Sequence, residues 1–319
     1  ATLVSGLAGM GDGKAVGRIG GKALGWFLGA SLISLLIGLV MANLLRPGDA
    51  ISLPLPDVSA TTDLKTSSLN LKNFITHVFP KSIFESMANN EILQILIFAL
   101  FFGIALGKLH DKTALGLVKT CEEIVHVMLQ VTDYVMRFAP IGVFAAVASV
   151  ITFHGLGVLE VYGRYMAYFY LALALLWLVL ITAGYLVLGK EVFRLIKLIR
   201  GPMLIGFSTA SSESAYPKLM EQLEKFGIKD RITGFVLPLG YSFNLDGSML
   251  NTAFVSIFIA QAYGIEMSIG QQVTMLLVLM VSSKGIAGVP RASLVVIAAV
   301  LPMFNLPEAG LLLILGIDH

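Results

Sequence analysis

The sequence predicts an all-α polytopic membrane protein, and three observations support this. Hydrophobic residues make up 56% and charged residues 13% of the 319 residues, and the mean hydropathy is +0.85, whereas a soluble domain has about 25% charged residues. Two uncharged apolar runs, 23–45 and 166–189, reach the roughly 20 residues that a helix needs to cross a bilayer. Other apolar segments are shorter and contain glycine and proline. Because backbone groups in lipid must bond to one another, these segments are expected to be helical.

Charge and cysteine content exclude several classes of protein. The net charge is only +2 and the basic residues are scattered, which argues against nucleic acid as a partner. Cys121 is the single cysteine, so an internal disulfide and a cysteine metal cluster are excluded. G-x-S-x-G is missing and no nucleophile–base pair or metal cluster stands out, so the chain is not expected to be an enzyme or to carry a cofactor.

The connections between the apolar segments predict how the chain is oriented. Residues 9–22 are rich in glycine and basic residues, and we expect them to form a connection into the first span. Residues 14–22 and 190–200 are basic and should be cytoplasmic, which leaves the polar, proline-containing segment 46–72 outside. The first residue is not Met, and the last apolar run stops short. We therefore expect an internal portion of a longer chain, with authentic ends as the alternative.

Two places in the second half predict re-entrant hairpins. Apolar pieces 267–282 and 292–306 are each short for a span, and the Gly/Pro-containing sequence SKGIAGVPR joins them. A similar arrangement surrounds the polar tract FSTASSESAYP at 207–217. Irregular backbone at membrane depth persists only where protein or water surrounds it. Paired interrupted segments of this kind point to a substrate site in secondary transporters.

Asp246 is the strongest single functional signal. It is the one carboxylate between residues 231 and 266, and a charge at the centre of a membrane helix costs about 2.5–3.5 kcal/mol. An interruption of the helix beside it would free backbone carbonyls around Gly240 and Ser242. Together with Asn244 and Asp246 these would form an all-oxygen site for a hard cation such as Na⁺. The alternative is a kinked helix in which Asp246 pairs with a Lys or Arg of another helix.

The serine tract at 211–214 is a candidate anion site. Hydroxyls and the N–H groups at helix N-termini can hold a carboxylate without a metal. A polar loop that merely faces water is the alternative, and the position of the tract between two short segments favours the site. Glu213 could carry a proton within the site or be a solvated or capping residue.

Four motifs in chain order resemble the dicarboxylate/amino acid:cation symporter family, of the glutamate-transporter type. They are GYSFNLDGS (240–248), STASSESAYP (208–217), SSKGIAGVPRAS (282–293) and GLLLILGID (310–318). The resemblance implies a glutamate-transporter-type fold with two re-entrant helical hairpins and an interrupted helix, assembled as a homotrimer and working by an elevator motion. It implies cation sites formed by Gly240, Ser242, Asn244 and Asp246 with Ser283 and Gly285. It implies substrate contacts from Ser211, Ser212, Ser248, Gly288 and Val289.

The same resemblance implies a division of the chain into scaffold and transport parts. Residues 1–14 would end a scaffold helix, 15–46 would be a transport-domain helix, 47–155 would hold scaffold and trimerisation helices with the outer loop, and 156–319 would be the transport domain up to the start of its last helix.

Some positions depart from the family pattern. Sodium-coupled members use a Tyr and a Thr-Ser pair where this chain has Phe27, Ala30 and Ser31, so two oxygen donors are lost and proton coupling is left open. Ala210 stands where some members have an arginine. In members without that arginine, the arginine that binds the carboxylate comes from the last helix, beyond Asp318.

The sequence therefore predicts a secondary active symporter in the inner (plasma) membrane. It would import an acidic amino acid or a four-carbon dicarboxylate with Na⁺ and/or H⁺, with a small anionic substrate and the lipid bilayer as its partners. The alternative is a channel that conducts anions through the same helices.

Overall fold

The structure is a computed structural model that describes residues 4, 13–49, 55–56, 81–88, 92–109, 112–138, 141, 144–145, 148, 152, 158–284, 292–315 and 317. Regular secondary structure in these residues is helical, without a strand, as predicted. The first group of helices is α2 (Gly13–Leu45), α4 (Ile83–Ala88), α5 (Ile92–Lys108), α6 (Lys112–Met136) and α8 (Val158–Leu188). The second group is α9 (Glu191–Thr209), η1 (Glu213–Ala215), α10 (Tyr216–Phe226), α11 (Asp230–Phe243), α12 (Asp246–Ala262), α13 (Ile269–Ser282), α14 (Ala292–Val300), η2 (Leu301–Phe304) and η3 (Glu308–Leu313).

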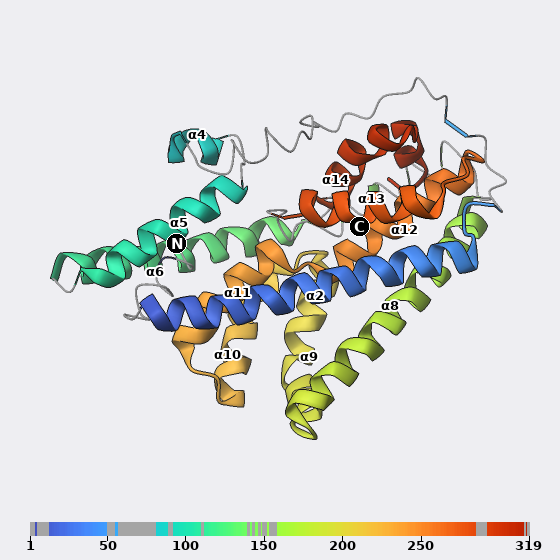
Figure 1. The fold of residues 1–319 in the computed structure, drawn as a ribbon. Coiled ribbons are helices and arrows are strands. Elements are labelled where there is room, and N and C mark those ends of the chain that lie inside the picture. The colour runs from blue at the N-terminus through green and yellow to red at the C-terminus, as the bar shows by residue number, and fades with distance from the viewer. Residues whose placement is uncertain are drawn as a thin grey trace.

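Two helices among the described residues are long and apolar enough to cross a membrane. They are Gly17–Leu45 within α2 and Glu160–Leu188 within α8, and they overlap the two predicted spans in position. The other apolar helices are shorter, including Ile269–Ser282 and Ser293–Phe304. Figure 1 shows α2 running alongside α11 and α12, with α8 near its far end and α5 and α6 toward its start.

The prediction of a connection over residues 9–22 is wrong for its second half, because α2 begins at Gly13. Adding residues to an existing helix costs far less than starting one, so the long apolar run that follows extends the helix backward. Glycines usually favour a turn, but a Cβ at Gly17 or Gly21 would meet no atom within 4 Å. These glycines therefore neither require nor produce a turn.

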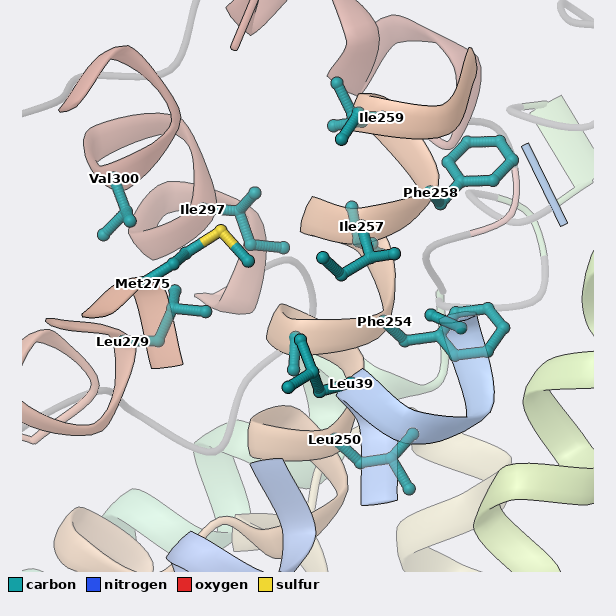
Figure 2. Close-up of a cluster of buried hydrophobic side chains, with 14 of the residues drawn as sticks. Leu39, Leu250, Phe254, Ile257, Phe258, Ile259, Met275, Leu279, Ile297 and Val300 are labelled. Atoms are coloured by element: carbon teal, nitrogen blue, oxygen red, sulfur yellow. The ribbon is translucent and has the colours of Figure 1, made fainter. Parts of the chain in front are cut away.

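Helix α12 is the centre of the hydrophobic core. Nearly every residue from Met249 to Ala260 is buried, and α2, α8, α13 and α14 pack around this helix. Figure 2 shows Leu250, Phe254, Ile257, Phe258 and Ile259 of α12 among side chains of the neighbouring helices. Those neighbours are Leu39 of α2, Met275 and Leu279 of α13, and Ile297 and Val300 of α14.

The packing of α2 on α12 depends on a close backbone approach. A Cβ at Gly38 would clash with the carbonyl oxygen of Leu250, so only glycine fits there. Gln261 then fastens the ends of the two helices, since its Nε2 donates to the Ala42 carbonyl at 2.9 Å and its Oε1 accepts from the Gly48 amide at 3.1 Å. These contacts fix the register of α2 against α12, and with it the position of the α2 side chains near the start of α12.

Two helix pairs lie where hairpins were predicted. Helix α9 ends at Ala210, which has a left-handed conformation (φ 49°), and then packs against η1 and α10. Helix α13 packs against α14, and the residues that join them lie outside the described part. The expected start of a last helix at 310–318 falls on the 3₁₀ turns of η3.

Candidate functional site

The chain leaves helical geometry between α11 and α12. Asn244 (φ −137°, ψ 65°) and Leu245 (φ −93°, ψ 73°) separate the two helices. Helix α11 keeps its hydrogen bonding up to this point, because the Asn244 amide donates to the Gly240 carbonyl at 2.8 Å. The Gly240 carbonyl thus accepts one hydrogen bond within the helix, and its contribution to a cation site stays a prediction. In a continuous helix the Phe243 carbonyl would accept from the amide four residues later, and here side chains of other helices contact it instead.

Two serines of α2 meet the polar side chains at this break. Ser31 and Ser34 lie three residues apart, on one face of the helix, and both are fully buried. The Ser34 hydroxyl lies 3.2 Å from Asp246 Oδ1 and 2.9 Å from the Ala30 carbonyl, and its one proton can serve either acceptor. Ser31 Oγ lies 3.4 Å from Asn244 Oδ1.

The Asp246 carboxylate is held from two sides. Asn244 Nδ2 donates to Asp246 Oδ2 at 3.2 Å, and Ser34 contacts the other oxygen. Asp246 is also the first residue of α12, where a negative charge is stabilised by the exposed N–H groups of the helix N-terminus. The sequence singled out this residue, whose role in a cation site stays a prediction, but it did not identify Ser34.

Lys284 also reaches the break, and sequence reasoning missed its role. Its ammonium donates to the Phe243 carbonyl at 2.8 Å and to Ser31 Oγ at 3.0 Å. It also attracts the Asp246 carboxylate electrostatically, so the alternative of a basic partner for Asp246 has a specific candidate. The rule that marked Asp246, an ionisable side chain in an apolar segment, applies equally to this lysine.

One cavity joins the predicted cation residues to two of the predicted substrate residues. It has a volume of about 530 Å³, within the range of small-molecule sites. The predicted residues that line it are Gly240, Asn244, Asp246, Ser212 and Ser248. Apolar and aromatic residues complete the wall, namely Phe27, Leu219, Val236, Leu237, Tyr241 and Leu245, together with Gly247. The break and the serine tract, which are far apart along the chain, thus share one space.

The serine tract forms a compact turn that hydrogen bonds of its own hydroxyls stabilise. Thr209 Oγ1 and Ser214 Oγ lie 2.5 Å apart, and Ser214 also donates to the Ser211 carbonyl at 2.7 Å. Ser211 is buried, whereas the exposed Ser212 lines the cavity. Tyr216, which follows the turn, packs on Tyr241 of α11 with ring centroids 5.5 Å apart, so an aromatic contact connects the turn to the helix that ends at the break.

The remaining predicted residues are described only in part. Gly285, Gly288 and Val289 lie outside the described residues, and so does the side chain of Ser242. Ser283 is buried at the end of α13, and its hydroxyl donates to the Met280 carbonyl of its own helix at 3.0 Å.

Comparisons with known proteins identify the family of this chain. A model of the sodium:dicarboxylate symporter family matches residues 1–319. The C4-dicarboxylate transport protein of Bacillus subtilis (strain 168) is 36% identical over 322 residues, covering all of this chain and 76% of that protein. The corresponding protein of Pseudomonas chlororaphis is 41% identical with 72% of it covered, and the proton/glutamate-aspartate symporter of Escherichia coli (strain K12) is 39% identical with 74% covered. All of this chain is covered in both cases. The resemblance identified from the motifs is confirmed, and it is to transporters and not to enzymes: the chain belongs to the sodium:dicarboxylate symporter family.

Proposed function

We propose that the protein is a secondary active symporter that imports an acidic amino acid or a four-carbon dicarboxylate together with Na⁺ and/or H⁺. Relatives named for transport of C4-dicarboxylates and of glutamate and aspartate support this substrate class. The single observation that carries the proposal is the cavity in which Asp246 and Asn244 of the helix break lie with Ser212 and Ser248. One side of this space suits a cation and the other suits a carboxylate.

The charge of Asp246 explains why such a site would couple the two solutes. An anionic substrate in the same cavity would be repelled by the carboxylate, and two like charges about 4 Å apart repel by about 4 kcal/mol at an intermediate dielectric constant. A cation bound at the carboxylate removes this repulsion and adds attraction. The substrate therefore binds best after the cation, and the gradient of the cation can drive its uptake.

The chain supplies polar groups for the anion without a metal. The serine tract contributes hydroxyls, and α12 begins at Asp246, so the amides of its first turn face the break with their positive ends. Ser248, in this turn, lines the cavity. These groups would hold a carboxylate through neutral donors.

The side-chain oxygens near the break are compatible with either Na⁺ or H⁺ as the coupling ion. Ser31 contacts the break through its hydroxyl, but Phe27 and Ala30 offer no side-chain oxygen. Fewer oxygens make a sodium site weaker. A proton, in contrast, needs only one acceptor that can take it up.

We further propose that the chain works by an elevator motion as a homotrimer in the inner (plasma) membrane, which it would cross several times. This proposal includes the division of the chain into scaffold parts (1–14 and 47–155) and transport parts (15–46 and 156–319). It also includes an interrupted membrane helix, α11–α12, and two re-entrant hairpins, α9–α10 and α13–α14. The length of α13 supports the hairpin: its 14 residues span about 21 Å, less than the hydrocarbon thickness of about 30 Å.

Uptake into liposomes that contain the purified protein tests the function. Labelled aspartate and succinate are offered under an inward Na⁺ gradient, an inward proton gradient, or neither. We expect accumulation above the outside concentration under at least one gradient, and its loss when an ionophore collapses that gradient. Flux that follows only the anion's own electrochemical gradient would instead establish the channel alternative.

A further inference from the structure

Lys284 places a positive charge among oxygens that suit a cation. Its Nζ lies 2.8 Å from the Phe243 carbonyl oxygen and 3.0 Å from Ser31 Oγ. Both acceptors are neutral, and the carbonyl is available because the helix is broken after Phe243. A Na⁺ ion at this part of the break would use the same two oxygens.

We propose that the Lys284 ammonium is a tethered cation that competes with Na⁺ for the helix break and so lowers the affinity of the site for Na⁺. This rests on the proposed function, because it assumes that the break is a cation site. The lysine and a bound ion exclude each other, since two positive charges on the same oxygens repel. Sodium must therefore displace the ammonium, and the attraction of Asp246 for the ammonium adds to the cost.

The hydrogen bonds distinguish this role from that of a structural ion pair. A lysine that only neutralises a carboxylate donates to the carboxylate itself. Here both Asp246 oxygens are contacted by other groups, Oδ1 by Ser34 and Oδ2 by Asn244, while Lys284 donates to the carbonyl and the hydroxyl. The carboxylate thus remains an available charge beside a position that the ammonium fills.

The position of Lys284 allows its ammonium to leave the break when an ion binds. Ser283 is the C-cap of α13, so the lysine follows directly after this helix and reaches the break from a different helix than the serines. Its four-carbon stem lets the ammonium move away when an ion takes its place, whereas Ser31 is buried in α2 and Phe243 is the last residue of α11.

Sodium-dependent thermal stability of the purified protein tests this directly and needs no transport. An ion that binds only the folded state raises the melting temperature as its concentration exceeds its Kd. Melting is measured in NaCl titrations, with choline chloride keeping the ionic strength constant. We expect Lys284→Met, which removes the charge and keeps a long apolar side chain, to lower the half-maximal NaCl concentration at least tenfold relative to wild type. Lys284→Gln should do the same, and this provides a second variant if the first does not fold.

Matched variants test whether the positive charge of Lys284 causes the low sodium affinity. Lys284→Arg keeps the charge and should keep the weak response of the wild type. Lys225→Met makes the same change on the exposed face of α10 and should also leave the response unchanged. Adding Asp246→Asn to Lys284→Met should abolish the gain in sodium affinity, because Na⁺ then has no carboxylate to bind.

Either of two sodium responses would overturn the proposal, and so would one stability result. One is an unchanged sodium response in both neutral variants, and the other is an equal gain in Lys284→Arg. A lower melting temperature in every salt, without restoration by Na⁺, would assign Lys284 to structure alone and so also overturn it. The proposed function is judged separately, since wild-type protein that accumulates neither substrate under either gradient would refute that function whatever the sodium response of these variants.

Discussion

The second half of the chain interrupts its helices at two places near one cavity, and the two interruptions are stabilised differently. At the α9–α10 turn, the side chains of Thr209 and Ser214 bond to each other and to the Ser211 carbonyl, all within a few residues. At the α11–α12 break, the partners are distant: Ser34 lies 212 residues before Asp246, and Lys284 follows Phe243 by 41 residues. The first interruption is satisfied locally, and the second needs the assembled fold.

This difference indicates which interruption carries the charge-dependent chemistry. The hydroxyls of Thr209 and Ser214 at the turn bond to neutral acceptors, so these contacts can persist whether or not a solute is bound. The break holds a carboxylate, an ammonium and a released carbonyl close together, and under the proposed function their balance would change when a cation binds. We therefore expect substitutions at the break to alter transport strongly and equivalent substitutions at the turn to alter it weakly.

The largest effect is expected for Asp246→Asn. The change removes the negative charge that attracts the cation, and its new amide group faces the Asn244 Nδ2 donor. We expect gradient-driven uptake to fall at least about a hundredfold, corresponding to about 2.7 kcal/mol, while expression and membrane insertion persist. Uptake into proteoliposomes measures the change.

Asp230→Asn provides the matched control. Asp230 is exposed in the first turn of α11, at the opposite end of this helix from the break, and uptake should stay near the wild-type value. Undiminished uptake by Asp246→Asn would contradict the cation site, and equal loss in both variants would indicate a general effect of removing a charge.

Gly38→Ala tests whether the break depends on the packing of α2. The added Cβ would clash with the Leu250 carbonyl oxygen, which pushes α2 away from α12 and moves Ser31 and Ser34 from the break. We expect a loss of roughly 3 kcal/mol in stability, at the upper end of the cost of overpacking, together with reduced uptake. The melting temperature of the purified protein measures the first effect.

Gly29→Ala on the same helix is its control, because a Cβ there meets no atom within 4 Å. This variant should be neutral or stabilised by up to about 1 kcal/mol, since alanine forms helix better than glycine. A similar loss of stability in both variants would mean that the close approach at Gly38 does not matter.

The sequence located the helix break but only part of its surroundings. Asp246, Asn244 and the helix interruption were accessible because a carboxylate, a proline and glycines in an apolar stretch are local signals. Ser34 was not identified, since its role depends on contacts that a linear pattern does not contain. Lys284 was also missed, although the rule that marked Asp246 applies to it as well. Glycines within residues 9–22 suggested a connection, but the long apolar run that follows extends α2 backward to Gly13. The fold class and family followed from composition and from four motifs, whereas the 3₁₀ turns of η3 had no clear local signal.

Ser34→Ala removes one hydroxyl from the break, for comparison with the same substitution at the turn. The Asp246 carboxylate loses the donor to its Oδ1, and hydrogen bonds to charged groups contribute about 1.5–3 kcal/mol. We expect the stability to fall by about 2 kcal/mol, seen as a lower melting temperature. Because Ser34 also lies near the Ala30 carbonyl, Ser34→Thr, which keeps the hydroxyl, should recover most of the loss. No recovery would assign the effect to volume and not to the hydrogen bond.

Ser214→Ala makes the same substitution at the turn and has the smallest expected effect. It removes the contact with Thr209 Oγ1 and the donation to the Ser211 carbonyl. Both partners are neutral, and Thr209 Oγ1 keeps its hydrogen-bonding contact with the Ser211 carbonyl at 3.1 Å. Neutral hydrogen bonds contribute about 0.5–1.5 kcal/mol, so we expect a loss of about 1 kcal/mol and at least half of the wild-type uptake. If Ser214→Ala reduced uptake as much as Asp246→Asn, the turn would be part of the charge-dependent site, and the distinction between a locally satisfied turn and a break that needs the whole fold would not hold.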